Sequence, residues 1–218
     1  THSTHISEAS NVENMNILSK VGEGCETYQP TTGLDPIDIG NIQRYLDAVR
    51  SNLLFAKSVM LVEGDAEELL IPTLVKKVLG MTLDELGISL INIRSTGFQN
   101  VAVLFHDDRI KKRCAIVTDL DATFFDTTPA AADDDALSKF KARCASAQTK
   151  GLARKAALDS FSHGNPWVEC FYAPHTFEVD FVGARNADQI VGAIASVYKD
   201  PATIAKAKTE LESKDIAV

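Results

Sequence analysis

Acidic residues end two apolar segments that the sequence predicts to be strands. Glu63 lies at the end of KSVMLVEG (57–64), and Asp119 and Asp121 lie at the end of RCAIVTDLD (113–121). A short continuous apolar run is typical of a strand buried on both faces of a parallel sheet. Because ligands bind beyond the carboxyl ends of parallel strands, we expect these carboxylates to lie at one edge of the sheet.

The spacing of these acids indicates a metal site. Asp119 and Asp121 are two residues apart, so in an extended chain their side chains point to the same side. Glu67 follows Glu63 by about one helical turn, across a bend that Gly64 makes sterically easy. Four converging carboxylates repel one another unless cations lie among them. Mg²⁺ and Mn²⁺ prefer carboxylate oxygen and keep waters for a substrate phosphate, so they fit this pattern.

The acids that follow Gly64 also have a purely structural interpretation. Asp65 and Glu68 fall in the first turn of a predicted helix, where the helix dipole and capping favour acids. Their spacing fits a capping box, and Gly80 suits the end of the helix. Glu63 precedes the helix, so capping does not account for it.

Strands alternate with helices along most of the chain, which predicts an α/β fold with a mainly parallel sheet of about four strands. Residues 1–40 are expected to be an irregular lead-in. The elements expected after it are a helix at 41–56, a strand at 57–64, a helix at 65–80 kinked or broken near Pro72, a strand at 88–96, a short helix within 97–107, a strand at 113–121, a helix at 134–161, a strand at 167–174, and two helices within 187–213 divided near Asp200 and Pro201.

Composition narrows the class of protein. Of the 218 residues, 45% are hydrophobic and 24% charged, as in ordinary globular proteins. No apolar run reaches the roughly 18 residues of a membrane span and no signal peptide is evident, so no membrane partner and a cytoplasmic location are expected. The four cysteines, Cys25, Cys114, Cys144 and Cys170, have neither zinc-site nor disulfide-framework spacing.

The net charge of −8 argues against nucleic-acid binding by bulk electrostatics, although a local basic face remains open. A cluster of basic residues after the second acidic strand is the candidate for contact with DNA phosphates, and a solvated helix face is the equally weighted alternative. Its members are Lys139, Lys141, Arg143, Lys150, Arg154 and Lys155.

The two acidic segments resemble a known domain. LVEGDAE (61–67) with IVTDLDA (116–122) is similar to the TOPRIM domain of topoisomerases, primases and several nucleases, which has a glutamate after its first strand and a DxD after its third. RYLDAVRSNLLFAKSVMLVEGDAEELLIP (44–72) and HTFEVDF (175–181) resemble more narrowly the OLD (overcoming lysogenization defect) nucleases, in which an ABC-type ATPase precedes the TOPRIM nuclease. The implied fold is a Rossmann-like TOPRIM domain at 41–186 with a helical insertion at 134–161, followed by C-terminal helices at 187–218.

The resemblance implies a two-metal DNA nuclease that uses Mg²⁺ or Mn²⁺, with Ca²⁺ able to occupy the site without turnover. Glu63, Asp119 and Asp121 would be the catalytic residues. The implied metal ligands are Glu63, Glu67, Asp119, Asp121, Glu178 and Thr118, with Asp180 as a weaker addition. OLD relatives have a lysine on a helix that follows the Thr-x-Glu segment, here Thr176 to Glu178. This lysine has no evident counterpart in the chain, so no catalytic lysine is assigned.

The start of the chain, THSTHI (1–6), resembles the end of an ABC-type ATPase, with His2 as a nucleotide-sensing residue. Walker A and Walker B motifs are absent from the sequence, so no complete ATP site and no ATP hydrolysis are expected. The implied partners are DNA and an N-terminal ATPase domain, and a homodimer stays open. The alternatives are a primase-like, RNA-processing or topoisomerase-related TOPRIM protein, and a Mg²⁺-binding module without catalysis.

Overall fold

The computed structural model describes residues 3–21, 23–46 and 49–213, and His2 therefore lies outside the described residues. The chain divides into two units, each considered by itself. The first comprises Thr1–Thr118 and Ala156–Phe171, and the second comprises Asp119–Lys155 and Tyr172–Val218.

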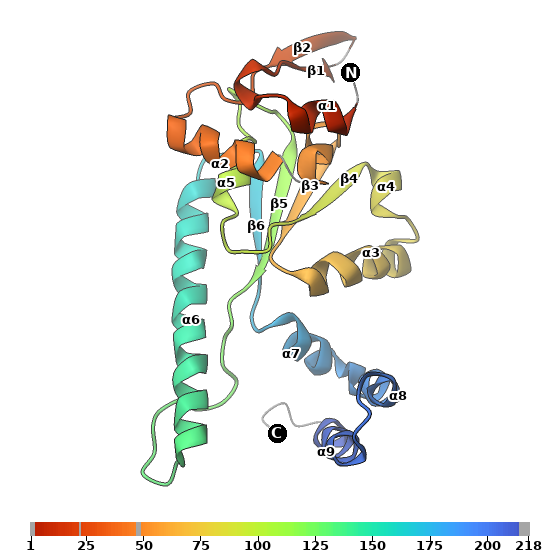
Figure 1. The fold of residues 1–218 in the computed structure, drawn as a ribbon, viewed down its shortest axis with the longest axis vertical. Helices are drawn as coiled ribbons and strands as arrows, with labels where there is room; N and C mark the ends of the chain where they lie inside the picture. Colours follow the sequence, from red (N-terminus) through yellow and green to blue (C-terminus); the bar gives the residue numbers. More distant parts are fainter. Residues whose placement is uncertain (1–2, 22, 47–48, 214–218) are drawn as a thin grey trace. The chain divides into compact units, whose positions relative to one another are not determined.

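Among the described residues, four strands form the predicted parallel sheet (Figure 1). They are β3 (Ser58–Val62), β4 (Ile88–Asn92), β5 (Arg113–Asp119) and β6 (Val168–Ala173), in the order β4-β3-β5-β6. β3 pairs in parallel with both β4 and β5. The backbone N–H of Cys114 donates to Trp167, and that of Leu120 donates to Ala173, so β6 runs in the same direction as β5. The α/β class is confirmed.

Buried apolar side chains explain why these segments are strands. Leu61, Val62 and Ile116 are fully buried, and Phe98 and Phe105, in the connection that leads to β5, are fully buried as well. Apolar side chains on a strand covered on both faces produce a continuous hydrophobic run instead of an alternating one. The helices of the first unit around this sheet are α2 (Pro36–Leu46), the 3₁₀ turn η2 (Val49–Leu54), α3 (Asp65–Leu79), α4 (Leu83–Leu86) and α5 (Gln99–Ala102).

The residues before α2 are more regular than the sequence predicted. They form α1 (Thr4–Ala9), a 3₁₀ turn η1 (Val12–Asn14) and an antiparallel pair, β1 (Ile17–Val21) and β2 (Gly24–Tyr28). The expectation of an irregular segment was wrong because both strands are short and most of β2 is exposed, which leaves little hydrophobic alternation.

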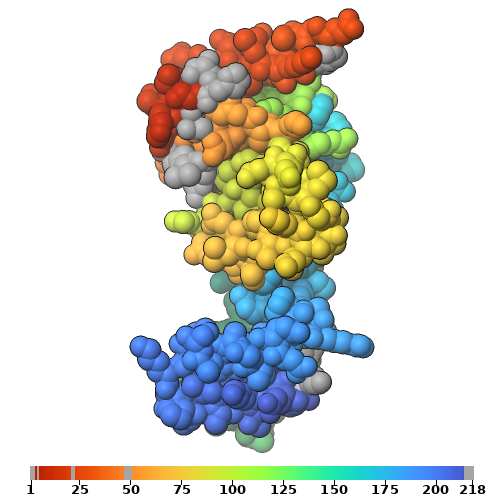
Figure 2. Space-filling model, turned by 90° about the vertical axis from the view of Figure 1, so that its right-hand side faces the viewer, coloured from red at the N-terminus to blue at the C-terminus, as the bar shows by residue number. Residues whose placement is uncertain are grey.

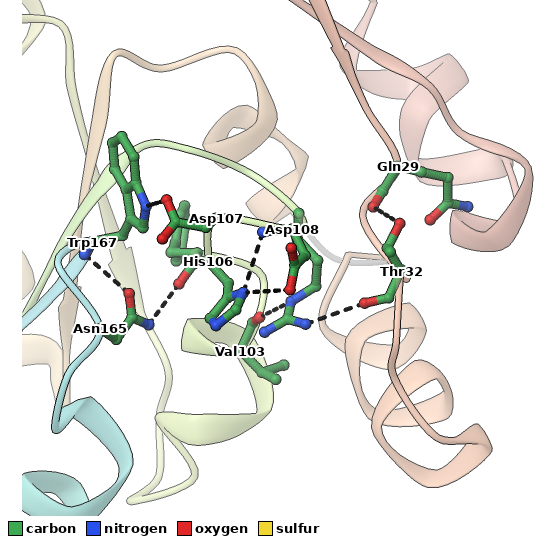
Figure 3. A network of polar contacts seen from close by, with 10 residues as sticks. Gln29, Thr32, Val103, His106, Asp107, Asp108, Asn165 and Trp167 are labelled. Carbon is green, nitrogen blue, oxygen red and sulfur yellow. Dashed lines mark hydrogen bonds and ion pairs between the residues drawn. The ribbon is translucent and has the colours of Figure 1, made fainter.

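Polar contacts order the chain before β5 and β6, at the amino ends of these strands (Figure 3). Trp167 Nε1 donates to Asp107 Oδ1 at 2.8 Å, and Asn165 Nδ2 donates to the Phe105 carbonyl at 2.9 Å. The Arg109 guanidinium donates to the carbonyls of Val103 and Thr32, at 2.6 and 3.1 Å. This network holds the loop that enters β5 and thereby fixes the start of the strand.

The second unit contains most of α6 (Asp135–Ser162), a single continuous helix, together with α7 (Phe177–Phe181), the π-helical turn η3 (Val182–Asn186), α8 (Ala187–Val197) and α9 (Pro201–Glu212). Asp200 accepts a hydrogen bond from the Thr203 N–H at 2.9 Å and caps α9, so the predicted division near Asp200 is confirmed. No helix within the described ranges is long and apolar enough to cross a membrane.

Candidate metal and phosphodiester site

Glu63 and Thr118 lie side by side at the carboxyl ends of β3 and β5. The register pairs Val62 with Val117, so Glu63 and Thr118, which follow them, lie opposite each other. The Thr118 hydroxyl donates to Glu63 Oε2 at 2.7 Å, and Thr118 is 2% exposed. A hydroxyl that donates to a carboxylate makes a charge-assisted hydrogen bond, which is stronger than a hydrogen bond between two neutral groups. The parallel register therefore orients the Glu63 carboxylate.

The first turn of α3 is organised differently from the predicted capping box. The N-cap is Gly64, which makes no side-chain cap bond, and Asp65 is already the first helical residue. Asn92, at the end of β4, instead donates from Nδ2 to Asp65 Oδ1 and to Glu68 Oε2, both at 2.8 Å. The capping-box prediction was wrong because a tertiary partner takes both carboxylates.

Asn92, at the end of β4, contacts the first turn of α3 and was not predicted from the sequence. It is 6% exposed, and its Oδ1 accepts a hydrogen bond from the Arg94 N–H at 2.8 Å. A buried side-chain amide must have its hydrogen-bonding groups satisfied, and Asn92 does this by joining the end of β4 to the start of α3. The available signal was an asparagine that ends the apolar run ISLIN.

Gly64 provides space for Glu67 and has no special backbone conformation. Its φ of −140° and ψ of −178° are open to any residue. A Cβ placed on Gly64 would lie 3.2 Å from Glu67 Oε2. The Glu67 carboxylate therefore packs over the backbone at the end of β3, where a larger residue would require it to shift.

The DxD segment is bent where the sequence predicted extended chain. β5 ends at Asp119, and Asp121 has a φ of +52°, in the left-handed region. Aspartate is one of the few residue types that tolerates this region. Both aspartates still face one group, because Arg154 Nη2 lies 3.2 Å from Asp119 Oδ1 and 3.4 Å from Asp121 Oδ2. The common orientation of the pair comes from this turn and from Arg154.

Helix α6 approaches the backbone of the DxD segment closely. A Cβ on Gly151 would lie 2.1 Å from the Leu120 carbonyl oxygen, so no other residue fits at this position without movement of the backbone. One turn earlier on the helix, Gln148 is 3.2 Å from the Thr123 hydroxyl. Gln148, Gly151 and Arg154 thus form one face of α6 along residues 119–123.

The C-terminal candidates lie on and around α7. Asp180 Oδ1 is 2.8 Å from His175 Nδ1, and Asp180 Oδ2 accepts from the His175 N–H at 3.3 Å. Glu178 is exposed in the first turn of α7, after the N-cap Thr176. Asp180 is therefore held by a histidine, while the Glu178 side chain is accessible.

The six basic residues predicted to contact DNA fall into two groups. Lys139, Arg143 and Lys150 are exposed on α6, and the Arg143 guanidinium lies 5.9 Å from the centre of the Phe140 ring. The other three have partners within the second unit: Arg154 binds the DxD aspartates, Lys141 forms an ion pair with Asp133 at 2.9 Å, and the Lys155 ammonium lies 4.4 Å from the centre of the Tyr172 ring.

The donor chemistry of these residues suits a hard divalent ion. Glu63, Glu67, Asp119 and Asp121 offer carboxylate oxygens, and Thr118 offers a hydroxyl already directed at one of them. In the part of the chain that the structure describes, no three His, Cys, Asp or Glu side chains are gathered as a metal-ligand cluster. Instead, Thr118 binds the Glu63 carboxylate, and Arg154 binds those of Asp119 and Asp121.

A parallel sheet with a glutamate after its first strand and a DxD after its third defines the TOPRIM class of domain. Residues 54–121 match the family model described as "Overcoming lysogenization defect protein-like, TOPRIM domain". The chain therefore contains an OLD-like TOPRIM domain, as the sequence indicated. Glu63, Glu67, Thr118, Asp119 and Asp121 all fall inside the matched segment.

Two solved structures are also similar to this chain. The C-terminal region of the Burkholderia pseudomallei OLD protein is similar at a TM-score of 0.50 and 25% identity, over 72% of this chain and 74% of that chain. The C-terminal region of the Xanthomonas campestris pv. campestris OLD protein is similar at a TM-score of 0.48 and 20% identity, over 77% and 74% of the two chains. Comparison with curated proteins gives no match. Residues 54–121 are thus those of an OLD-like TOPRIM domain, and TOPRIM domains generally bind divalent metals.

Proposed function

We propose that this chain is a divalent-metal-dependent DNA endonuclease that hydrolyses phosphodiester bonds with two ions. The observation that carries the proposal is the hydrogen bond between Thr118 and Glu63. The residue that follows Thr118 in β5 is Asp119, the first aspartate of the DxD. This hydrogen bond supports the proposal because it orients the Glu63 carboxylate at the carboxyl end of β3, as the metal site of the TOPRIM class requires.

In this proposal Glu63 and Glu67 bind metal from the end of β3 and the start of α3, and Asp119 and Asp121 bind it from the end of β5. Glu178 is a further ligand, supported by its exposure on α7. Asp180 is a weaker one because His175 already holds its carboxylate. Two such ions, when bound, would supply a hydroxide nucleophile at neutral pH and charge stabilisation for the leaving oxygen.

The protein's own residues have distinct tasks around these ligands. Thr118 keeps the Glu63 carboxylate in one orientation. Asn92 donates hydrogen bonds to Asp65 and Glu68 in the first turn of α3. Because Asp65 and Glu68 are already bonded, Glu67 is the acid of that turn assigned to metal. The exposed Lys139, Arg143 and Lys150 are the side chains proposed to contact DNA phosphates, and such contacts would make binding salt-dependent.

The proposed partner besides DNA is an ABC-type ATPase domain, as in OLD nucleases, with this chain acting as the nuclease part of the fusion. The support is the OLD-like domain match together with the similarity to C-terminal regions of OLD proteins. The prediction about His2 stays a prediction. ATP hydrolysis by this chain at the rate of a full-length relative would contradict the assignment.

Incubation with supercoiled plasmid and Mg²⁺ or Mn²⁺ tests the proposal. We expect nicked and linear products that vanish with EDTA and with Asp119→Ala, while Asp188→Ala, which removes an acid on α8, leaves cleavage unchanged. An intact plasmid at high protein concentration with either ion would contradict nuclease activity. Metal binding without cleavage would support the non-catalytic module, and cleavage of RNA alone would support an RNA-processing protein.

A further inference from the structure

Arg154 differs from the other basic residues of α6 because its charge is directed at the DxD segment. Its Nη2 donates to the Asp119 carbonyl at 2.7 Å and lies 3.2 Å from Asp119 Oδ1 and 3.4 Å from Asp121 Oδ2. Its side chain is 11% exposed. A largely buried guanidinium that bridges two carboxylates is poorly placed to reach a DNA backbone at the surface.

We propose that Arg154 is a positioning residue for the DxD: it holds Asp119 and Asp121 toward one point, and divalent cations bind these two carboxylates in competition with its guanidinium. This inference rests on the proposed function, because it concerns the same ligands. It replaces the direct DNA-binding role that the sequence predicted for Arg154.

The backbone gives Arg154 this reach. The helix can lie against residues 119–123 only because Gly151 leaves room for the Leu120 carbonyl. Arg154 is one turn further along the same face, so its side chain is brought to the acids by the packing of the whole helix. The chain turns at Asp121, where φ is +52°, and the Asp121 carboxylate lies 3.4 Å from the same Arg154 nitrogen that contacts Asp119.

The negative charges of Asp119 and Asp121 require a nearby positive charge. Two carboxylates that share one site repel each other, and a nearby opposite charge offsets that repulsion. The guanidinium forms charge-assisted bonds to both aspartates from one nitrogen. A divalent ion that uses the same oxygen atoms must replace those bonds, so the arginine lowers the apparent affinity for metal while it keeps the acids in place.

The affinity for Mn²⁺, measured by calorimetric titration of the full chain without DNA, tests the competition. We expect Arg154→Met to bind Mn²⁺ about tenfold more tightly than the unmodified chain, since the loss of a charged hydrogen-bonding competitor is of that order. Arg154→Lys, which keeps the charge but loses the planar fork, should lie between them. Lys199→Met, which removes one positive charge from an exposed position of the same unit, should not change the affinity.

A purely structural role for Arg154 would weaken or leave unchanged the binding of Mn²⁺ when the residue is replaced, and either result would overturn the inference. A second measurement keeps the inference separate from the proposed function. In EDTA, a double-mutant cycle of Asp119→Asn with Arg154→Met should show coupling of about tenfold in the folding equilibrium constant. An unmodified chain that binds no Mn²⁺ would overturn the proposed function and the competition, while absence of coupling in the cycle would overturn the positioning role itself.

Discussion

Thr118 Oγ1 lies 2.7 Å from Glu63 Oε2, although 55 residues separate them in the chain. The pairing of Val62 with Val117 places the two residues on neighbouring strands at the same level. Since Thr118 is buried, its hydroxyl depends on this carboxylate for a charge-assisted partner.

Replacement of Thr118 by valine keeps the shape of the side chain and removes the hydroxyl. We expect the free energy of unfolding to fall by about 1–3 kcal/mol, the range for loss of a hydrogen bond to a charged group. Chemical denaturation measures this change. Thr27→Val, on the exposed strand β2, is the matched control and should have little effect. Equal stability of the two variants would show that the bond to Glu63 contributes nothing.

Gly151→Ala tests the close approach of α6 to the DxD segment. The added methyl would lie 2.1 Å from the Leu120 carbonyl oxygen, so we expect destabilisation of at least about 1–3 kcal/mol, the usual cost of overpacking. Gly192→Ala in α8 meets nothing within 4 Å and should be neutral, or stabilising by about 0.5–1 kcal/mol. Thermal unfolding of both variants gives the comparison, and a fully stable Gly151→Ala would refute the predicted steric conflict.

Asn92→Ala removes the amide that bonds Asp65 and Glu68. The two carboxylates lose a shared donor, so we expect a loss of about 1–3 kcal/mol in stability and faster amide exchange in the first turn of α3. Asn92→Asp should be more damaging, because it places a third carboxylate beside the first two. Hydrogen exchange followed by mass spectrometry measures the local effect. Protection of residues 65–68 that does not change would rule out this role.

The Asp133 carboxyl gives a prediction in pH. The backbone N–H of Ala130 and then the Lys141 ammonium hold its pKa below the ordinary value of 3.8. A carboxyl whose pKa is lowered in the folded state stabilises the fold at a pH above its ordinary pKa. This stabilisation is lost as the pH falls through the lowered pKa. Lys141→Met should therefore raise the pKa of Asp133 part of the way back, because the Ala130 bond remains. Carboxyl-carbon NMR titration measures it, with Lys199→Met as the control. An unchanged pKa would mean that the ion pair has no influence.

Local pattern predicted most of the elements of this protein. The apolar runs of β3, β4 and β5, the end of α3 at Gly80 and the division before α9 near Asp200 all depend on neighbours within a few residues. Such features can be recognised in sequence. The short β1 and β2 could not be recognised, because an exposed hairpin has no hydrophobic alternation to reveal it.

The sequence by itself determined the kinds of side chain at the end of each strand: Glu63 after β3, and Asp119 with Asp121 at β5. Only the tertiary structure decided their partners. Strand register placed Thr118 against Glu63, and the space left by Gly151 brought Arg154 to both aspartates. Contacts between residues tens of positions apart depend on how elements pack, and packing is set by the summed fit of many buried side chains, which no local pattern records.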